Sequence, residues 1–231
     1  NKVYKDWEKF FSSDKKNDYL FDYHKQDGYF PFQSESAKGS YEKDLKEFFH
    51  IYLSWGRYPD FIDKDTLILY NEIMLLGKEL LKYIDQYSPK KISKNFSEPL
   101  HEMSENSNQN LMRVIHYPPL KNNINNNEIR AACHTDINLI TLLISGSQPG
   151  LQVKDNAGNW INVVSKKGQI VVNIGDMLQE CSKSYLDFSA QIGGPNQSGN
   201  GLFMKGVTTA NTTSELVTTS PAFATDASVF G

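Results

Sequence analysis

The chain has 231 residues, of which 39% are hydrophobic and 22% charged, with a formal net charge of −3. This is an ordinary globular composition, and the spread-out lysines give no case for a nucleic-acid or anionic-membrane surface. Two cysteines, Cys133 and Cys181, are too few for a disulfide framework or a zinc knuckle. No apolar run approaches the roughly 20 residues of a membrane span and the charged opening is no signal peptide, so we expect a cytoplasmic protein.

The first half of the chain carries helical patterns. Residues 6–11 and 41–55 hold apolar side chains at helical spacing, and the order Ser97-Glu98-Pro99 opens a further short helix. The clearest helix is expected over residues 65–87. Its apolar stripe, at alternating steps of three and four, consists of Leu67, Tyr70, Met74, Gly77, Leu81 and Ile84. We expect this stripe to pack on the rest of the domain rather than on a partner, because a single amphipathic helix in a compact domain normally buries its own stripe.

From residue 111 the pattern changes to short strands separated by Gly, Pro and Asn turns. A first strand over 111–117 ends at Pro118-Pro119. Further strands are expected over 139–144, 151–153, 160–164 and 169–176. This spacing predicts a β-barrel or sandwich rather than βαβ units. The expected core residues of these strands are Leu139, Leu142, Ile144, Leu151, Val153, Ile161, Val171 and Ile174.

One short motif among these strands carries metal chemistry. In an extended strand residues i and i+2 share a face, so His134 and Asp136 point the same way, with Cys133 and Thr135 on the other side. Imidazole plus carboxylate is two-thirds of the 2-His-1-carboxylate triad that holds Fe(II) and leaves open positions. A bare His-x-Asp is also common at polar strand ends and turns, so the motif alone does not establish a metal site.

The order and spacing of several motifs resemble one enzyme family. They are the runs His134-Thr135-Asp136, Leu139-Ile140-Thr141-Leu142-Leu143, Gly150-Leu151-Gln152-Val153, Val172-Asn173-Ile174-Gly175-Asp176 and Arg113-Val114-Ile115-His116-Tyr117-Pro118-Pro119. Over roughly residues 20–186 the chain resembles the Fe(II)/2-oxoglutarate-dependent oxygenases of the isopenicillin N synthase-like group. The resemblance implies a mainly β double-stranded β-helix, a jelly-roll barrel with helices packed outside. It also implies Fe(II) and 2-oxoglutarate as cofactors, with dioxygen and a small molecule as substrates.

The same resemblance gives Tyr117 a role. It stands where many relatives have a tyrosine that hydrogen-bonds 2-oxoglutarate, although the Asn often found two residues earlier is Ile115 here. The alternative is an ordinary strand tyrosine beside a Pro-Pro stop. His116 should face the opposite way, as a satisfied histidine rather than a ligand.

Two features of the family are missing after residue 186. Relatives carry a distal metal-binding His followed by an Arg-x-Ser that binds the far carboxylate of 2-oxoglutarate. Here no His or Arg follows Asp136, and the place of the distal His falls near Gln191. A carboxamide is a poor substitute for imidazole on Fe(II), so we expect weak Fe(II) binding and little uncoupled conversion of 2-oxoglutarate to succinate.

The composition also changes at this point. Residues 1–186 are interpreted as an oxygenase-like domain, with N-terminal helices and then barrel strands from about 111, whereas 187–231 are rich in Gly, Ser, Thr and Ala. This tail could be a diverged segment that still closes the barrel, a replacement of other origin, or an error in the sequence. If foreign, it should have few contacts with the strand over 139–144.

Two functions therefore compete on the sequence alone. In the first, the chain is an oxygenase in which His134 and Asp136 bind Fe(II) and Tyr117 lies in the 2-oxoglutarate site. In the second, it is a catalytically silent barrel that serves as a binding or structural module, because a fold does not settle a function.

Overall fold

The computed structural model describes residues 2–36, 43–120, 130–187 without positions 145, 156, 165 and 167, the backbone of 191–193, and 201–208. The helices are α1 (Lys2–Ser12), the 3-10 helix η1 (Asp14–Tyr19), α2 (Asp65–Tyr87), α3 (Lys90–Ser93), α4 (Leu100–Glu105) and α5 (Asp176–Cys181). The strands are β1 (Gly28–Phe30), β2 (Glu47–Ile51), β3 (Leu111–Tyr117), β4 (Ala131–His134), β5 (Ile140–Ile144), β6 (Gln152–Lys154), β7 (Trp160–Asn162), β8 (Ile170–Ile174), β9 (Gln191–Gly193) and β10 (Gly201–Thr208).

The strands form two sheets, in the orders β1-β2-β3-β10-β5-β8 and β4-β9-β6-β7. The chain passes repeatedly from one sheet to the other, and each antiparallel pair of strands encloses the next pair along the sequence. The hairpin β6–β7 lies innermost, followed by the pairs β5–β8, β4–β9 and β3–β10. An antiparallel ribbon folded over in this way is a jelly roll, so the predicted double-stranded β-helix is confirmed.

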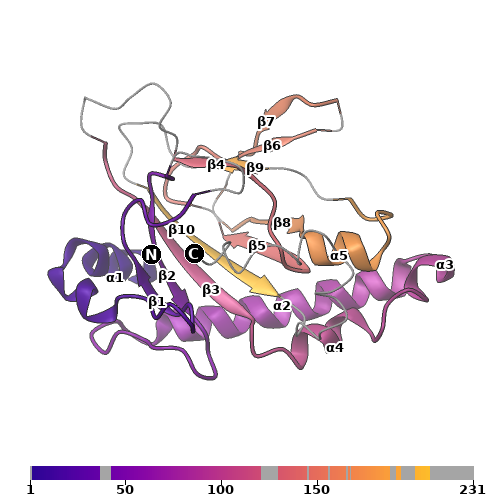
Figure 1. The fold of residues 1–231 in the computed structure, drawn as a ribbon, viewed down its shortest axis with the longest axis horizontal. Coiled ribbons are helices and arrows are strands. Elements are labelled where there is room, and N and C mark those ends of the chain that lie inside the picture. Colours follow the sequence, from indigo (N-terminus) through magenta and orange to yellow (C-terminus); the bar gives the residue numbers. More distant parts are fainter. Residues whose placement is uncertain are drawn as a thin grey trace.

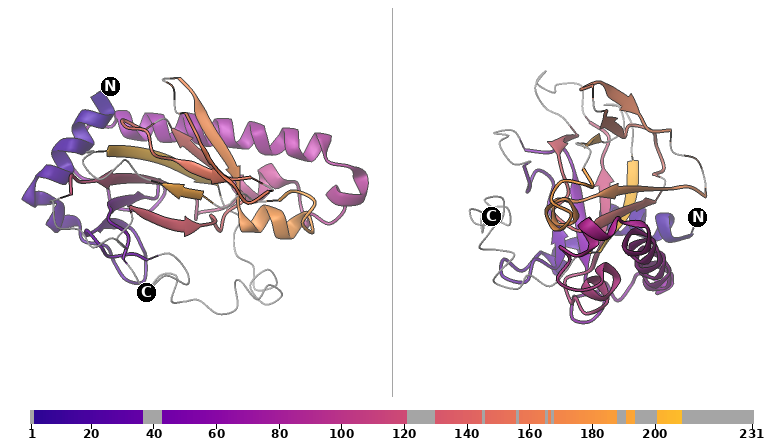
Figure 2. Two further views of the ribbon diagram at one scale, coloured as in Figure 1. Left: turned by 90° about the horizontal axis from the view of Figure 1, so that it is seen from above. Right: turned by 90° about the vertical axis from the view of Figure 1, so that its right-hand side faces the viewer.

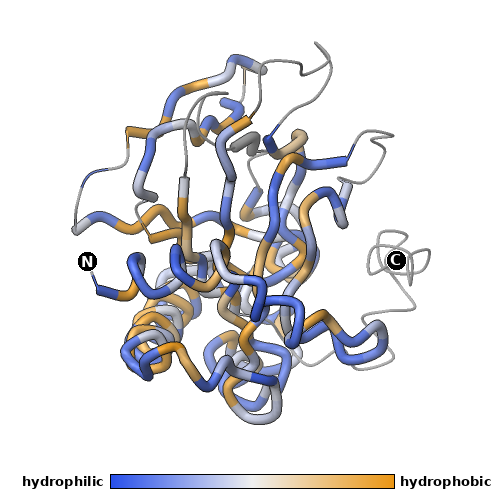
Figure 3. The backbone as a smooth tube through the Cα atoms, turned by 90° about the vertical axis from the view of Figure 1, so that its left-hand side faces the viewer, coloured by the Kyte–Doolittle hydropathy of each residue, from blue (hydrophilic) through white to orange (hydrophobic). Residues whose placement is uncertain are grey.

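Helices cover the outer face of the larger sheet. In Figure 1, α2 runs along that sheet on the side away from β4, β9, β6 and β7, and the two views in Figure 2 show the same layers. The predicted bounds of α2 are confirmed, and Tyr70, Gly77 and Leu81 of its stripe are buried. Helix α1 adds Trp7 and Phe10, both fully buried. Hydrophobic and hydrophilic residues alternate along these elements (Figure 3), as expected where one face is buried.

Strand β10 lies within the sheet, between β3 and β5. All five residues of β5 pair with it, from Met204↔Ile144 to Thr208↔Ile140. Two glycines let α2 approach this strand closely: a Cβ on Gly206 would lie 2.4 Å from Ile73 Cγ2, and one on Gly77 would lie 2.8 Å from Thr208 Cγ2. This packing favours the interpretation in which residues 201–208 close the barrel.

The contact between Gly206 and Ile73 gives a testable consequence. We expect Gly206→Ala to lower the free energy of unfolding by about 1–3 kcal/mol, because the added methyl overpacks the interface with α2. In an Ile73→Ala background the same change should cost less, since the opposing methyl groups are gone. Urea unfolding of the four proteins measures this coupling, and strictly additive costs would contradict the packing described here.

Two sequence predictions are wrong. Residues 47–51 form strand β2 rather than part of a helix over 41–55. Phe49 packs on Trp7 of α1 and Phe48 stacks on Phe30, so both faces of β2 are buried and its apolar residues show no strand alternation. Of the eight expected core residues, Ile161 is 50% exposed because β7 is the edge strand of the smaller sheet. Leu139 and Leu142 are fully buried, and the other five are only partly buried: Ile144, Leu151, Val153, Val171 and Ile174.

Candidate metal centre

The His134–Asp136 segment is held by the turn between β8 and α5. The backbone N–H of Asp176 donates to the Asp136 carbonyl (2.8 Å), and that of Met177 donates to the Ile137 carbonyl (3.0 Å). The turn approaches so closely that a Cβ on Gly175 would lie 2.0 Å from the Asn138 carbonyl oxygen. The two motifs therefore form one unit, although about 40 residues separate them, and Gly175 is required by this contact.

The imidazole of His134 is arranged as a ligand would be. Its Nδ1 lies 2.7 Å from the Ala132 carbonyl, to which it donates, so the Nε2 lone pair remains for another partner. Burial, assisted by the charge of Lys205, lowers the pKa of His134 below its ordinary value. A neutral imidazole with one nitrogen fixed by the backbone is the form that binds metals.

The Asp136 carboxylate is buried and well supported. Its Oδ2 accepts from Thr141 Oγ1 (2.6 Å) and Asn173 Nδ2 (3.1 Å), and its Oδ1 accepts from Lys205 Nζ (2.7 Å). Burial alone would raise its pKa, but the Lys205 ammonium, the His134 ring and these hydrogen bonds hold the pKa of Asp136 well below its usual range. His134 and Asp136 influence each other's pKa, as neighbouring side chains do.

Further charged side chains lie on the same inner face of the larger sheet. Lys205 is paired in register with Arg113, which in turn is paired with His50. Arg113 Nε donates to His50 Nε2 (2.7 Å), and its Nη1 lies 3.3 Å from Glu35. Lys46 contacts both Glu35 and Asp44 at 2.7 Å. Each cation of this group is thus paired with a carboxylate.

His50 makes the stability of the fold depend on pH. Its Nδ1 donates to the Gln26 carbonyl (2.9 Å) while Nε2 accepts from Arg113, so the ring is neutral. Burial and the Arg113 charge hold the pKa of His50 well below its ordinary value. Because this pKa is lower in the folded protein than the value of about 6.5 in the unfolded chain, the neutral ring stabilises the fold above about pH 6.5. The stabilisation is lost as the pH falls below about 6.5, at up to about 1.4 kcal/mol per pH unit.

We therefore expect the free energy of unfolding to fall between about pH 7 and pH 5 with a slope to which His50 contributes. Urea unfolding across this range measures the slope. His50→Gln should flatten it, whereas His24→Gln, at an exposed position, should leave it unchanged. Equal slopes in the wild type and His50→Gln would contradict this assignment.

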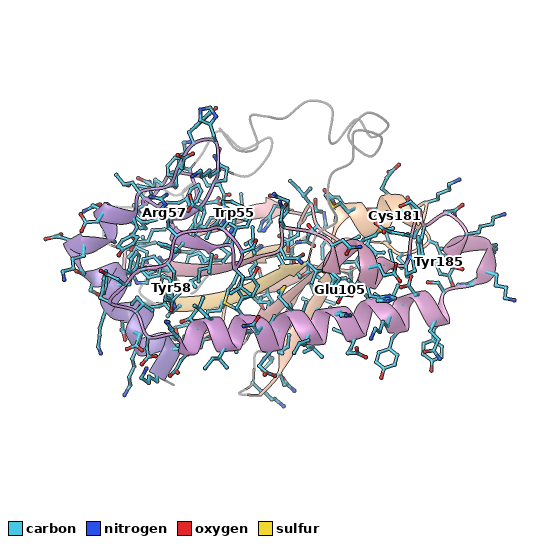
Figure 4. All side chains as sticks on the ribbon, turned by 90° about the horizontal axis from the view of Figure 1, so that it is seen from below. Trp55, Arg57, Tyr58, Glu105, Cys181 and Tyr185 are labelled. Carbon is cyan, nitrogen blue, oxygen red and sulfur yellow. The ribbon has the colours of Figure 1, made fainter. Side chains whose placement is uncertain are left out.

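The structure also places the other residues that the sequence analysis singled out. Tyr117 lies on the inner face with Arg113, is 5% exposed, and packs edge-on against Phe203 with ring centroids 5.5 Å apart. His116 faces outward, where its Nδ1 lies 2.7 Å from Glu47 Oε1 and its ring stacks on Phe11, which confirms a satisfied histidine. Cys133 is exposed, and Cys181 lies at the opposite end of the molecule from Trp55 and Arg57 (Figure 4).

Sequence reasoning did not assign Thr141, Asn173 and Lys205 to the site. Thr141 and Asn173 are opposite each other in the β5–β8 pairing, and both donate to Asp136. A polar residue within each apolar strand run was the available signal. For Lys205 the signal was its isolation, since it is the one cation after residue 187.

The donor set fits two of the three ligands of an Fe(II) site. Imidazole and carboxylate are suitable ligand types, and both have the supporting hydrogen bonds that orient metal ligands. Among the described residues no three His, Cys, Asp or Glu side chains cluster as a metal would require. Across the β4–β9 pairing, position 191 lies opposite His134. The prediction that the distal ligand belongs near Gln191 concerns a side chain outside the described residues.

Comparisons with known proteins point to one enzyme family. Residues 108–188 match the 2OG-Fe(II) oxygenase superfamily. A 2-oxoglutarate-dependent dioxygenase of Monascus ruber is 34% identical over 87 residues, which are 36% of this chain and 26% of the relative. The chain thus spans about a quarter of the length of the curated relatives it matches.

Solved structures extend the similarity to most of the chain. A Shewanella oneidensis protein assigned as an oxygenase is 41% identical, with a TM-score of 0.79, over 90% of this chain and 76% of that one. A Neurospora crassa protein, solved in complex with alpha-KG and thymine, is 22% identical with a TM-score of 0.68, over 90% and 71% of the two chains. The second similarity shows the fold alone. Within the described residues no helix is long and apolar enough to cross a membrane.

Proposed function

Because this chain belongs to the 2OG-Fe(II) oxygenase superfamily, we propose that it is an Fe(II)- and 2-oxoglutarate-dependent oxidoreductase that hydroxylates, desaturates or closes a ring in a small molecule. The observation that carries the proposal is the supported pair His134 and Asp136 on the inner face of the barrel. When bound, Fe(II) and 2-oxoglutarate supply the activation of dioxygen.

The residues of the chain then have separate tasks. His134 and Asp136 would hold the metal, with Ala132, Thr141 and Asn173 orienting them. Tyr117 would contribute to the 2-oxoglutarate site, which its position on the inner face allows.

The inner face also carries apolar side chains close to its polar groups. An apolar hollow on this face is lined by Leu143, Val171 and Phe203 among others, and Leu143 is the register partner of Lys205. An apolar wall close to a few polar groups is typical of small-molecule sites.

We also propose that the oxygenase domain continues beyond residue 186, because β10 supplies a strand in the centre of the larger sheet. The cytoplasmic location stays a prediction from the sequence, as does the absence of nucleic-acid and membrane partners.

Thermal unfolding with Mn(II) and 2-oxoglutarate, alone and together, tests the proposed site without requiring the substrate. We expect the highest Tm with both present, because a ligand that binds the folded state stabilises it by an amount that grows with the ratio of its concentration to its Kd. His134→Ala should abolish this joint effect. A Tm that responds equally in wild type and His134→Ala, or in neither, would favour the silent barrel. Succinate formation over a panel of small molecules then identifies the substrate.

A further inference from the structure

We propose that Lys205 is a built-in competitor for the metal: its ammonium holds the Asp136 carboxylate, and a metal ion must displace it in order to bind. The inference rests on the proposed function, since it takes His134 and Asp136 as the metal ligands. It adds a residue that sets the metal affinity of the site.

The first support for the proposal is the set of contacts that the Asp136 carboxylate makes. Lys205 Nζ lies 2.7 Å from Asp136 Oδ1, and the two side chains are 11% and 8% exposed. The other oxygen, Oδ2, already accepts hydrogen bonds from Thr141 and Asn173. A metal that uses Oδ1 would face the Lys205 ammonium at hydrogen-bond distance, where two cations repel each other strongly in a buried setting. The ion pair and the metal therefore exclude each other.

The second step is the cost of moving Lys205. Its backbone is fixed in β10 by pairing with Arg113 on one side and Leu143 on the other. Two further carboxylates of this region are already engaged: Glu35 with Lys46 and Arg113, and Asp44 with Lys46 and the Ala132 N–H. At these two carboxylates a displaced ammonium would have to compete with the cations already bound, and an unpaired buried charge is costly.

The charges of the ion-paired side chains around Lys205 also oppose the binding of a metal ion alone. The described ion pairs of this region join Lys46, Arg113 and Lys205 to Glu35, Asp44 and Asp136. A divalent cation would add two positive charges to this balanced set. A dianion such as 2-oxoglutarate would restore the balance, so metal and co-substrate should bind more tightly together than alone.

Anaerobic calorimetric titration of Mn(II) into the full chain tests the proposal. We expect Lys205→Met to bind Mn(II) at least about tenfold more tightly than the wild type, in the range by which supporting groups alter metal affinity. Lys205→Arg keeps a cation at the position and should retain the weak binding of the wild type. In the Lys205→Met background, His134→Ala should remove the gain.

Each other outcome has a defined meaning. Equal affinities of wild type and Lys205→Met, both sensitive to His134→Ala, would overturn the inference and leave the proposed site intact. Titrations insensitive to His134→Ala in every variant would overturn the proposed site itself. If Lys205→Met does not fold, lysine-selective ¹⁵N NMR of the wild type replaces it. The Lys205 ammonium signal, assigned with Lys205→Arg, should shift on addition of Zn(II), and an unchanged signal at saturation would overturn the competition.

Discussion

Asp136→Ala is expected to lower the free energy of unfolding of the metal-free protein by about 3–5 kcal/mol. The change removes the partner of the buried Lys205 ammonium and leaves Thr141 and Asn173 without their common acceptor. A buried charge left without its partner accounts for most of this cost. Urea unfolding in the presence of a chelator measures it without a contribution from metal.

The matched control removes both charges together. Asp136→Asn with Lys205→Met replaces the ion pair by an amide and an apolar side chain, and such a replacement is often close to neutral. We expect the double variant to be more stable than Asp136→Ala, even though it changes two residues. If the double variant were as unstable as Asp136→Ala, the charge of Lys205 would not be the source of the loss.

Gln191→His is expected to raise the affinity for Fe(II) by roughly an order of magnitude or more, because it would add an imidazole to a site with two ligands. Position 191 lies opposite His134 in the β4–β9 pairing. Anaerobic calorimetry of Fe(II) binding is the measurement.

A histidine at an unrelated position of the same sheet is the control. Asn162→His adds imidazole at an exposed position on β7 and should leave the affinity unchanged. Tight Fe(II) binding by the unaltered chain would mean that another residue completes the ligand set. Unchanged weak binding after Gln191→His would mean that the distal ligand position lies elsewhere.

Elements with one buried face were predictable from the sequence. The period of α2 and the turn-separated strands β5 to β8 gave correct types with bounds close to those observed. Strand β2 was missed because Phe48 packs into the barrel and Phe49 on α1, so its residues are buried without alternation. For β10 the sequence left barrel closure as one of three alternatives, since a strand containing Gly201 and Gly206 has weak strand propensity.

The residues of the site were likewise predictable from the sequence only in part. His134 and Asp136 were accessible from local spacing as a motif, although β4 ends at His134 and Asp136 lies just beyond the strand. Lys205 was not, since 69 residues separate it from Asp136 and only the β3–β10–β5 register brings the two together. The interior pairing of Arg113 with Glu35 depends in the same way on tertiary packing, which no local pattern encodes.

Anomalous scattering from crystals grown anaerobically with Mn(II) tests the central claim most directly, because it locates the metal rather than its effects. We expect one strong peak in contact with His134 and Asp136, with the Lys205 ammonium no longer bonded to Asp136. A peak elsewhere, or a bound metal beside an intact Lys205–Asp136 pair, would contradict it.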